Sequence, residues 1–362
     1  MQPAPYPTAP PGATAGPDAT GDAAHVAAAL AAAVDRSDLP LPGAGRTLER
    51  WQELARLGAR DLTLARVVEA HTDALAVLAE AGAGDLVPPG STWGVFAAEA
   101  AGTRLDARPD GPGWRLSGRK PWCSLAGALS HALVTARTPT GRRLFAVSLR
   151  GADVRVVPGA WHARGLRAVA SGPVDFDDVA ATPVGEDGWY LHRPGFAHGG
   201  AGVAACWYGG ASAVAAALTR SLTAPGVREP DQLARWHAGE NDLDLWRSRL
   251  ALEHAAAEVD AGRAAGTAGA RLALRTRSVV AAAAEAVLAR TGHALGPAPL
   301  ALDAEHAARV ADLTVYLRQH HAERDVAALG GDLAEDLAED LAEDLAEDPA
   351  QDPAGGGAGW PR

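Results

Sequence analysis

The spacing of apolar residues changes twice along the chain, and this change limits its fold more than any other feature. In residues 22–88 apolar positions recur about every 3.6 residues, which predicts amphipathic helices. In residues 89–186 apolar and polar residues alternate in short runs, separated by turn sequences such as PDGPG and PTG, which predicts antiparallel strands. Helical spacing returns in residues 187–330. The order helix, strand, helix excludes a parallel sheet with crossover helices.

These patterns predict an α+β fold with three parts. An N-terminal helical domain, 22–88, precedes a central antiparallel β-barrel or sandwich, 89–186, and a C-terminal four-helix bundle, 187–330. The leader 1–21 is rich in Pro, Ala, Gly and Thr, and we expect it to be disordered. We expect the same of the acidic tail 331–362, because its Leu-Ala-Glu-Asp repeats place like charges together and prolines follow.

The net charge of −11 comes mostly from this tail, so it does not describe the body of the chain. Residues 332–362 hold 10 acidic residues and one arginine, which leaves 32 basic and 34 acidic residues elsewhere. A nearly balanced body does not indicate a nucleic-acid partner. The Ala-rich runs are interrupted by charged residues, so no membrane span is predicted. Cys123 and Cys206 show no metal-ligand spacing, and two isolated cysteines predict a cytoplasmic protein without a metal site.

The sequence GRKPWCS, residues 118–124, forms a predicted turn between two strands and contains the only lysine of the chain, Lys120. It lies within an ordered set of segments over 91–215 that includes WGVFAAEAAGTRLDAR, GLRAVASGPVDFDDV and VGEDGWYLHRPG. The set resembles the acyl-CoA dehydrogenase family, and the resemblance covers about residues 45–330. It implies the family's three-part fold, bound FAD and a homodimer or homotetramer.

By this resemblance the turn supports the flavin. A flavin ring needs a rigid apolar platform and a hydrogen-bond donor near its reactive edge. Trp122 is then the apolar wall, and the Ser124 hydroxyl faces the N5/O4 edge of the flavin. The alternative is that Trp122 simply fills the mouth of the barrel and Ser124 is an exposed serine.

Two other segments resemble cofactor-binding parts of the family. Ala98 and Glu99, followed by Thr103, stand where the family approaches the flavin pyrimidine, although Ala98 lacks the usual hydroxyl. Glu99 could equally be a structural carboxylate. Gly292 and Gly296 resemble a turn that holds the adenosine end of a neighbouring subunit's FAD. A glycine pair between helices is also commonly a helix cap.

The catalytic base of the family, a glutamate, is not found where the resemblance places it. Gln319 and His320 stand there, and the next glutamate is Glu323. His320 is therefore the candidate base, because a neutral imidazole accepts a proton near neutral pH. The alternative is a surface or helix-capping histidine.

The resemblance implies an FAD-dependent oxidoreductase that acts on CH–CH groups. Its leading activity is α,β-dehydrogenation of a small-molecule acyl thioester with an external electron acceptor. Because the glutamate is missing, two alternatives stay open. One is a flavin-dependent monooxygenase on the same fold, and the other is a catalytically silent binding subunit.

Overall fold

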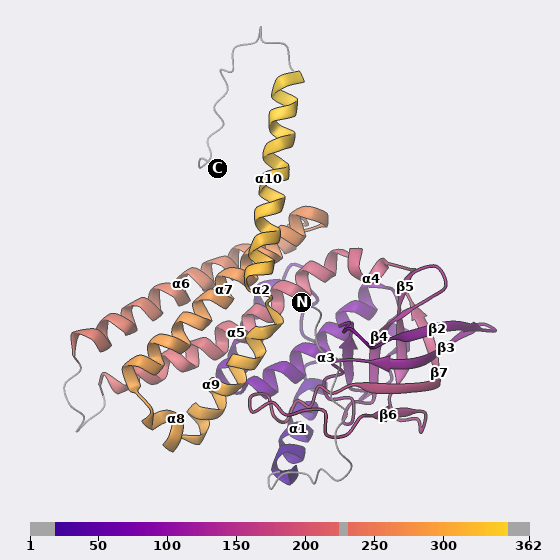
Figure 1. The fold of residues 1–362 in the computed structure, drawn as a ribbon, viewed down its shortest axis with the longest axis horizontal. Coiled ribbons are helices and arrows are strands. Elements are labelled where there is room, and N and C mark those ends of the chain that lie inside the picture. The colour runs from indigo at the N-terminus through magenta and orange to yellow at the C-terminus, as the bar shows by residue number, and fades with distance from the viewer. Residues whose placement is uncertain (1–18, 224–230, 347–362) are drawn as a thin grey trace. The chain divides into compact units, whose positions relative to one another are not determined.

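The structure is a computed structural model that describes residues 19–223 and 231–346. The chain divides after His320 into two units, which are described separately. The first unit contains a group of N-terminal helices, a sheet and a C-terminal bundle (Figure 1).

Three helices and a short 3₁₀ turn make up the N-terminal part. They are α1 (Ala19–Val34), α2 (Thr47–Arg60), α3 (Leu62–Glu80) and η1 (Gly84–Leu86). Helix α2 buries the face that carries Trp51, Leu54 and Leu57. Asp61 separates α2 from α3, because its side chain accepts a hydrogen bond from the Leu64 amide at 3.0 Å and so caps α3.

The central part is a seven-stranded sheet in the described residues. Its strands are β1 (Trp93–Phe96), β2 (Leu105–Asp110), β3 (Gly113–Lys120), β4 (His131–Arg137), β5 (Arg142–Ser148), β6 (Val154–Val156) and β7 (Val174–Val184). They pair in the order β1-β4-β2-β3-β7-β5, and β5 also pairs with β4, so the pairings close on themselves as in a barrel. β4 pairs in parallel with β1 and at one position with β2, which differs from the expected wholly antiparallel arrangement. The parallel pairing is possible because the β2–β3 hairpin lies in the connection between β1 and β4.

The C-terminal part is the expected helical bundle. Its elements are α4 (Trp189–His192), α5 (Pro194–Ser221), α6 (Gln232–Asp260), α7 (Gly266–Leu295), α8 (Ala298–Leu302), α9 (Ala304–Tyr316) and η2 (Leu317–Gln319). The four longest helices of this part, α5, α6, α7 and α9, form the bundle, which confirms the predicted fold class.

Helix α5 is the core helix of the first unit. It is long and apolar enough to cross a membrane, but 72% of its apolar window is buried inside the protein. Glycines let it approach α2 closely: a Cβ at Gly58 would overlap the carbonyl group of Cys206, and a Cβ at Gly209 would overlap that of Ala55. The two helices are therefore packed backbone to backbone.

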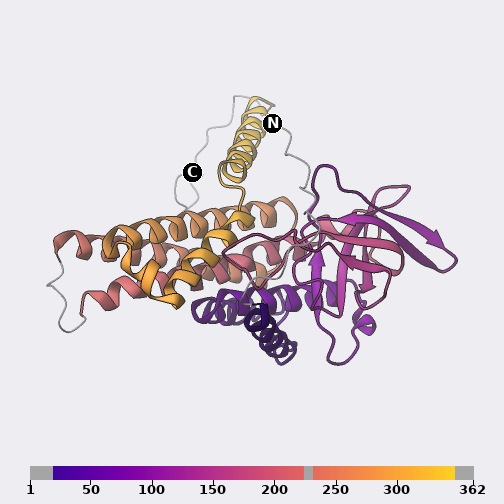
Figure 2. The ribbon, with the colours of Figure 1, turned by 60° about the horizontal axis from the view of Figure 1, so that its bottom comes forward.

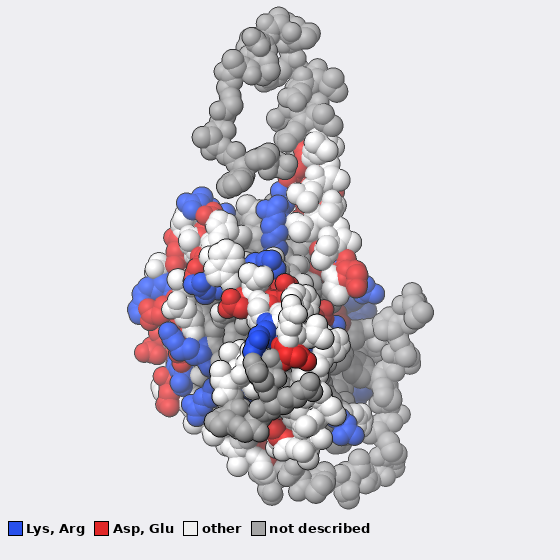
Figure 3. Space-filling model, turned by 90° about the vertical axis from the view of Figure 1, so that its left-hand side faces the viewer, with Lys and Arg blue, Asp and Glu red and all other residues white. Residues whose placement is uncertain are grey.

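The surface at the free end of the bundle carries both signs of charge. Figure 3 shows lysine or arginine side chains interspersed with aspartate and glutamate on this face, rather than gathered by sign. No basic stripe of the kind that binds nucleic acid is visible on the described residues of this face.

The second unit contains a helix where disorder is expected. Helix α10 spans Glu323–Ala346, so the prediction of a disordered tail is wrong for residues 331–346. Leu, Ala and Glu are strong helix formers, and this propensity outweighs the repulsion between acidic neighbours. Residues 347–362, with the three prolines of the tail, and residues 1–18 of the predicted leader lie outside the described residues.

Candidate functional site

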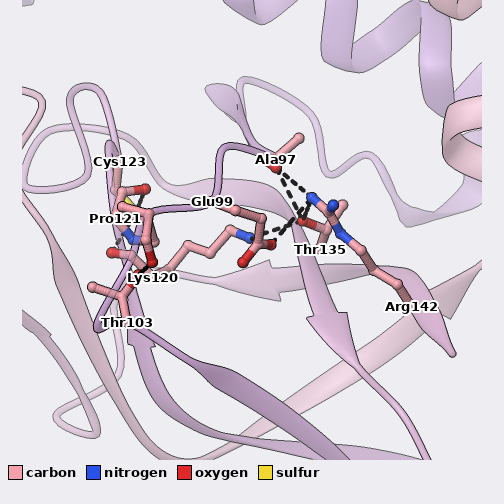
Figure 4. Close-up of polar contacts among 9 residues, drawn as sticks. Ala97, Glu99, Thr103, Lys120, Pro121, Cys123, Thr135 and Arg142 are labelled. Atoms are coloured by element: carbon pink, nitrogen blue, oxygen red, sulfur yellow. Dashed lines mark hydrogen bonds and ion pairs between the residues drawn. The ribbon is translucent and has the colours of Figure 1, made fainter. Parts of the chain in front are cut away.

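The turn that begins at Lys120 is anchored by a buried lysine. Its side chain is 1% exposed, and its Nζ donates hydrogen bonds to Glu99 Oε1 at 2.7 Å and Thr135 Oγ1 at 2.8 Å. Burial lowers the pKa of Lys120, and the bond to Glu99 partly opposes that change. Figure 4 shows the Glu99 carboxylate between Lys120 and Arg142, whose guanidinium lies 3.1 Å from it. Arg142 also donates to the carbonyl group of Ala97.

These contacts bring two predicted flavin-binding segments together. The chain after β1, residues 97–103, is held against the end of β3 by the Glu99–Lys120 pair. Gly118 permits this approach, because its φ is +123° and a Cβ there would overlap the carbonyl group of Arg104. Thr103 closes the segment, since its amide and its hydroxyl both donate to the carbonyl oxygen of Ala100.

The turn itself has an unusual backbone. Trp122 and Leu125 have φ values of 56° and 62°, in the left-handed region that non-glycine residues rarely adopt. A third segment holds them there: the Cys123 amide donates to Gly172 at 3.0 Å, and the Leu125 amide donates to Ala170 at 2.7 Å. Backbone strain of this kind costs about 1–3 kcal/mol per residue and clusters at ligand sites.

The side chains of this turn point in different ways. The Trp122 side chain is 48% exposed, whereas Cys123 is buried. The Ser124 hydroxyl lies 2.8 Å from the hydroxyl of Ser171. Burial raises the pKa of the Cys123 thiol, so this cysteine is a neutral packing residue.

A small cavity lies behind Ser124. It is enclosed by α3, β1 and the turn, and its lining includes Arg66, Phe96, Ser124 and Leu129. The Arg66 guanidinium is paired with Glu69 at 2.6 Å. Arg66 and Ser124 therefore line the same small cavity.

No protein-family model matches the chain, and a search of curated proteins finds no match. Solved structures do match. Glutaryl-CoA dehydrogenase from Mycobacterium smegmatis is 18% identical, with a TM-score of 0.71 over 87% of this chain and 90% of that one. KijD3 in complex with FMN and a dTDP-linked amino sugar is 19% identical, with a TM-score of 0.67 over 89% of this chain and 95% of that one. FMN-bound TdsC from Paenibacillus sp. A11-2, a dibenzothiophene monooxygenase, is 18% identical, with a TM-score of 0.66 over 85% and 95%.

The chain has the acyl-CoA dehydrogenase fold. The resemblance seen in the sequence is thereby confirmed at the level of the fold. At identities below 20% it settles neither the reaction nor the substrate.

The donors present at the turn suit a flavin. An exposed indole offers an apolar face, and the Ser124 hydroxyl offers a hydrogen-bond donor. Arg142 adds a buried donor, since its Nε has no hydrogen-bond partner among the described residues. Ala98, Glu99 and Thr103 lie on the segment held beside this turn.

His320 lies in the bundle interior rather than on the surface. It is 9% exposed and follows η2 as its C-terminal capping residue. Its Nε2 is 3.0 Å from the Ser278 hydroxyl on α7, and its ring meets Trp207 of α5 edge-on at a centroid distance of 6.4 Å. The structure thus places the candidate base among α5 and α7, and its catalytic role stays a prediction.

Gly292 and Gly296 lie elsewhere. Gly296 has a φ of 66° and caps α7, with its amide donating to the carbonyl of Gly292 at 3.0 Å. Helix α8 follows directly and lies at the end of the bundle away from the sheet in both Figure 1 and Figure 2. Within one chain, therefore, this pair is not brought to the turn at Ser124.

Sequence reasoning missed the charged residues of α3. Arg66 and Glu69 interrupt the apolar face of that helix and are largely buried with Tyr316 of α9. The available signal was two opposite charges three positions apart, among Leu64, Val67 and Val68.

Proposed function

We propose that the chain is a flavin-dependent oxidoreductase, with the flavin ring on Trp122 and the Ser124 hydroxyl at its reactive edge. The observation that carries the proposal is the turn itself. Trp122 and Leu125 have left-handed backbone conformations there, and hydrogen bonds to the segment 170–172 hold the turn in place. Solved structures of the same fold, KijD3 and TdsC, bind FMN. A bound flavin would supply two-electron chemistry at this edge.

Each residue near the turn would have a separate role toward the flavin. Trp122 would cover an apolar face of the ring, and Ser124 would hydrogen-bond its edge. Glu99, fixed by Lys120 and Arg142, would hold the backbone of residues 97–99 against the ring, so that its own carboxylate acts structurally. We keep FAD as the proposed cofactor, with Gly292 and Gly296 serving a neighbouring subunit's adenosine.

For the reaction, we infer monooxygenation of a small molecule by dioxygen and externally reduced flavin, with the second oxygen atom released as water. Helix α2 of the N-terminal part is in backbone contact with α5 at Gly58 and Gly209. An acyl chain cannot pass between helices packed this closely. His320 and Ser278 stand in place of the carboxylate base, and an imidazole there would take up and return a proton near neutral pH.

The second candidate is dehydrogenation of an acyl thioester, favoured by the glutaryl-CoA dehydrogenase likeness at a TM-score of 0.71. One experiment separates the two. The protein is loaded with FAD or FMN, its visible spectrum is recorded, and it is mixed without oxygen with a panel of acyl-CoAs or with NADH and a flavin reductase. Bleaching by the reductase alone supports monooxygenation, and bleaching by an acyl-CoA supports dehydrogenation. If the protein takes up neither flavin, both proposed reactions are refuted, and the alternative of a catalytically silent binding subunit is left.

We also propose that the chain forms a homodimer or homotetramer through α6. Five large apolar side chains on this helix are more than 40% exposed: Leu233, Trp236, Leu243, Trp246 and Leu250. Three of them are seven residues apart and share one face. An apolar stripe of this kind on a soluble helix indicates a protein contact.

The oligomer is tested by light scattering after size-exclusion chromatography. The double variant Trp236→Gln/Trp246→Gln should dissociate to monomers at micromolar concentration. Leu302→Gln is the matched control, because Leu302 is 85% exposed on α8, outside the stripe. A double variant with wild-type mass would contradict the proposal.

We propose a cytoplasmic location because both cysteines of the protein are free thiols. Cys123 and Cys206 are both free and buried. A reducing compartment keeps such thiols unmodified, and alkylation of the unfolded, freshly extracted protein should label both.

A further inference from the structure

A buried ionic group lies directly behind the flavin turn. Arg66 and Glu69 of α3 form an ion pair at 2.6 Å, with each side chain 14% exposed. Tyr316 of α9 is fully buried and donates its hydroxyl hydrogen to Glu69 Oε2 at 3.3 Å. The group therefore joins the N-terminal helices to the end of the bundle.

Arg66 stays positively charged although it is buried. Burial is the largest single effect and disfavours the guanidinium charge, but the attraction of Glu69 and of neighbouring groups together outweighs it, so the pKa of Arg66 is raised. Burial also raises the pKa of Glu69, while Arg66 and Tyr316 pull it down. Tyr316 stays neutral, because burial raises the pKa of its hydroxyl well above the usual value.

Only one member of this group is among the residues that line the cavity under Ser124. Arg66 lines it together with Ser124, and Glu69 lies one helical turn further along α3. Tyr316 holds Glu69 from the α9 side. Glu69 and Tyr316 thus fix the guanidinium from behind, and the cavity is the space that Arg66 and the serine hydroxyl share.

An ion pair at this position is costly if its only task is packing. Replacing a buried ion pair with apolar residues of similar size is often neutral or stabilising. The neighbours of the pair on α3, Val67 and Val68, are apolar and buried, so an apolar pair would have suited the same core. A fixed charge in a low-dielectric site has its largest effect on a charge that develops nearby.

We propose that Arg66 is the cation that stabilises negative charge on the flavin edge faced by Ser124, and that Glu69 and Tyr316 are its positioning residues. The inference rests on the proposed flavin site. Arg66 favours the reduced flavin and any anion bound at that edge. Glu69 tempers the effect, because it neutralises part of the guanidinium charge.

The test uses sulfite and the flavin reduction potential. Sulfite donates its sulfur lone pair to N5 of oxidised flavin, and the adduct carries the added negative charge, so a nearby cation tightens sulfite binding. Arg66→Met removes the cation and should weaken sulfite binding about tenfold, whereas Glu69→Gln unmasks the cation and should tighten it about tenfold. The potential should move with the same signs, by about 30 mV for each tenfold change of a two-electron equilibrium.

The opposite signs exclude a merely structural role, because general damage to the core would weaken binding in both variants. Arg66→Lys keeps a positive charge and should restore most of the sulfite affinity. If Arg66→Met does not fold, Glu69→Gln and Tyr316→Phe carry the test: Glu69→Gln should raise the potential and tighten sulfite binding, whereas Tyr316→Phe should lower the potential and weaken sulfite binding, because Arg66 is then held less firmly.

The outcomes separate this inference from the flavin proposal. A wild-type protein that binds no flavin overturns both. A flavin-bound wild type whose potential and sulfite affinity are unchanged in Glu69→Gln, and in any folded Arg66 variant, overturns the role of Arg66 alone.

Discussion

Truncation of Trp122 should weaken flavin binding far more than it weakens the fold. A fully buried aromatic side chain covers roughly 150–250 Å². Because the Trp122 side chain is 48% exposed, roughly half of that area remains for a bound ring, about 100 Å². At about 25 cal/mol per Å², Trp122→Ala should lose about 2.5 kcal/mol of binding free energy, or roughly 70-fold in Kd.

The measurement is a titration of apoprotein with FMN, followed by flavin fluorescence. FMN is preferred because it lacks the adenosine that a second subunit would hold. Leu302→Ala is the control, since Leu302 is 85% exposed on α8 and lies outside both the turn and the apolar stripe of α6. The two variants should lose similar stability in a thermal melt, and only Trp122→Ala should lose FMN affinity. Equal FMN affinity in both variants would refute the assignment of Trp122.

Two further predictions concern the fold around the site. Burial lowers the pKa of His71 to about 4, and its Nδ1 accepts a hydrogen bond from the Trp93 amide. Between about pH 6.5 and 4, therefore, His71 binds a proton in the unfolded chain but not in the folded chain. The free energy of unfolding should fall by about 3 kcal/mol as the pH drops through this range. The free energy of unfolding of His71→Asn, measured with urea, should depend less on pH than that of the wild type. An unchanged pH dependence would show that His71 does not cause it. Gly118→Ala should cost about 3 kcal/mol or more, because a Cβ there would overlap the Arg104 carbonyl group. Gly111→Ala should cost about 1 kcal/mol, because Gly111 also has a positive φ but has open space around it. Equal losses in the two variants would contradict the role of the Arg104 carbonyl group.

The three-part fold could be predicted from the sequence because it depends on local spacing. Helical and strand periods reflect which face of each element is buried, and these faces are buried as expected in α2 and over most of β7. The tail was mispredicted for a related reason. Charge repulsion in the Leu-Ala-Glu-Asp repeat was weighed above helix propensity, and α10 shows that propensity prevails as far as Ala346.

The candidate site was only partly predictable, because its contacts join distant segments. The motif identified Trp122 and Ser124, but it gave no sign that Lys120 would be buried against Glu99, 21 positions away. The parallel pairing of β1 with β4 is non-local in the same way. A sequence pattern records the face of an element and not the partner that covers it.

The buried charges show why chemistry is harder to read than fold. Arg66 and Glu69 fall in a helix whose other buried positions are mostly apolar, so the spacing of apolar residues assigns them no partner. Their partner is Tyr316, 247 positions from Glu69, and the cavity they serve is completed by β1 and the Ser124 turn. A buried charge pair loses hydration that the attraction within the pair offsets only in part or just balances, so a pair that interrupts an apolar core is a candidate for a further role of its field. Such interruptions are therefore the positions at which a divergent enzyme of this fold should be searched first for altered chemistry.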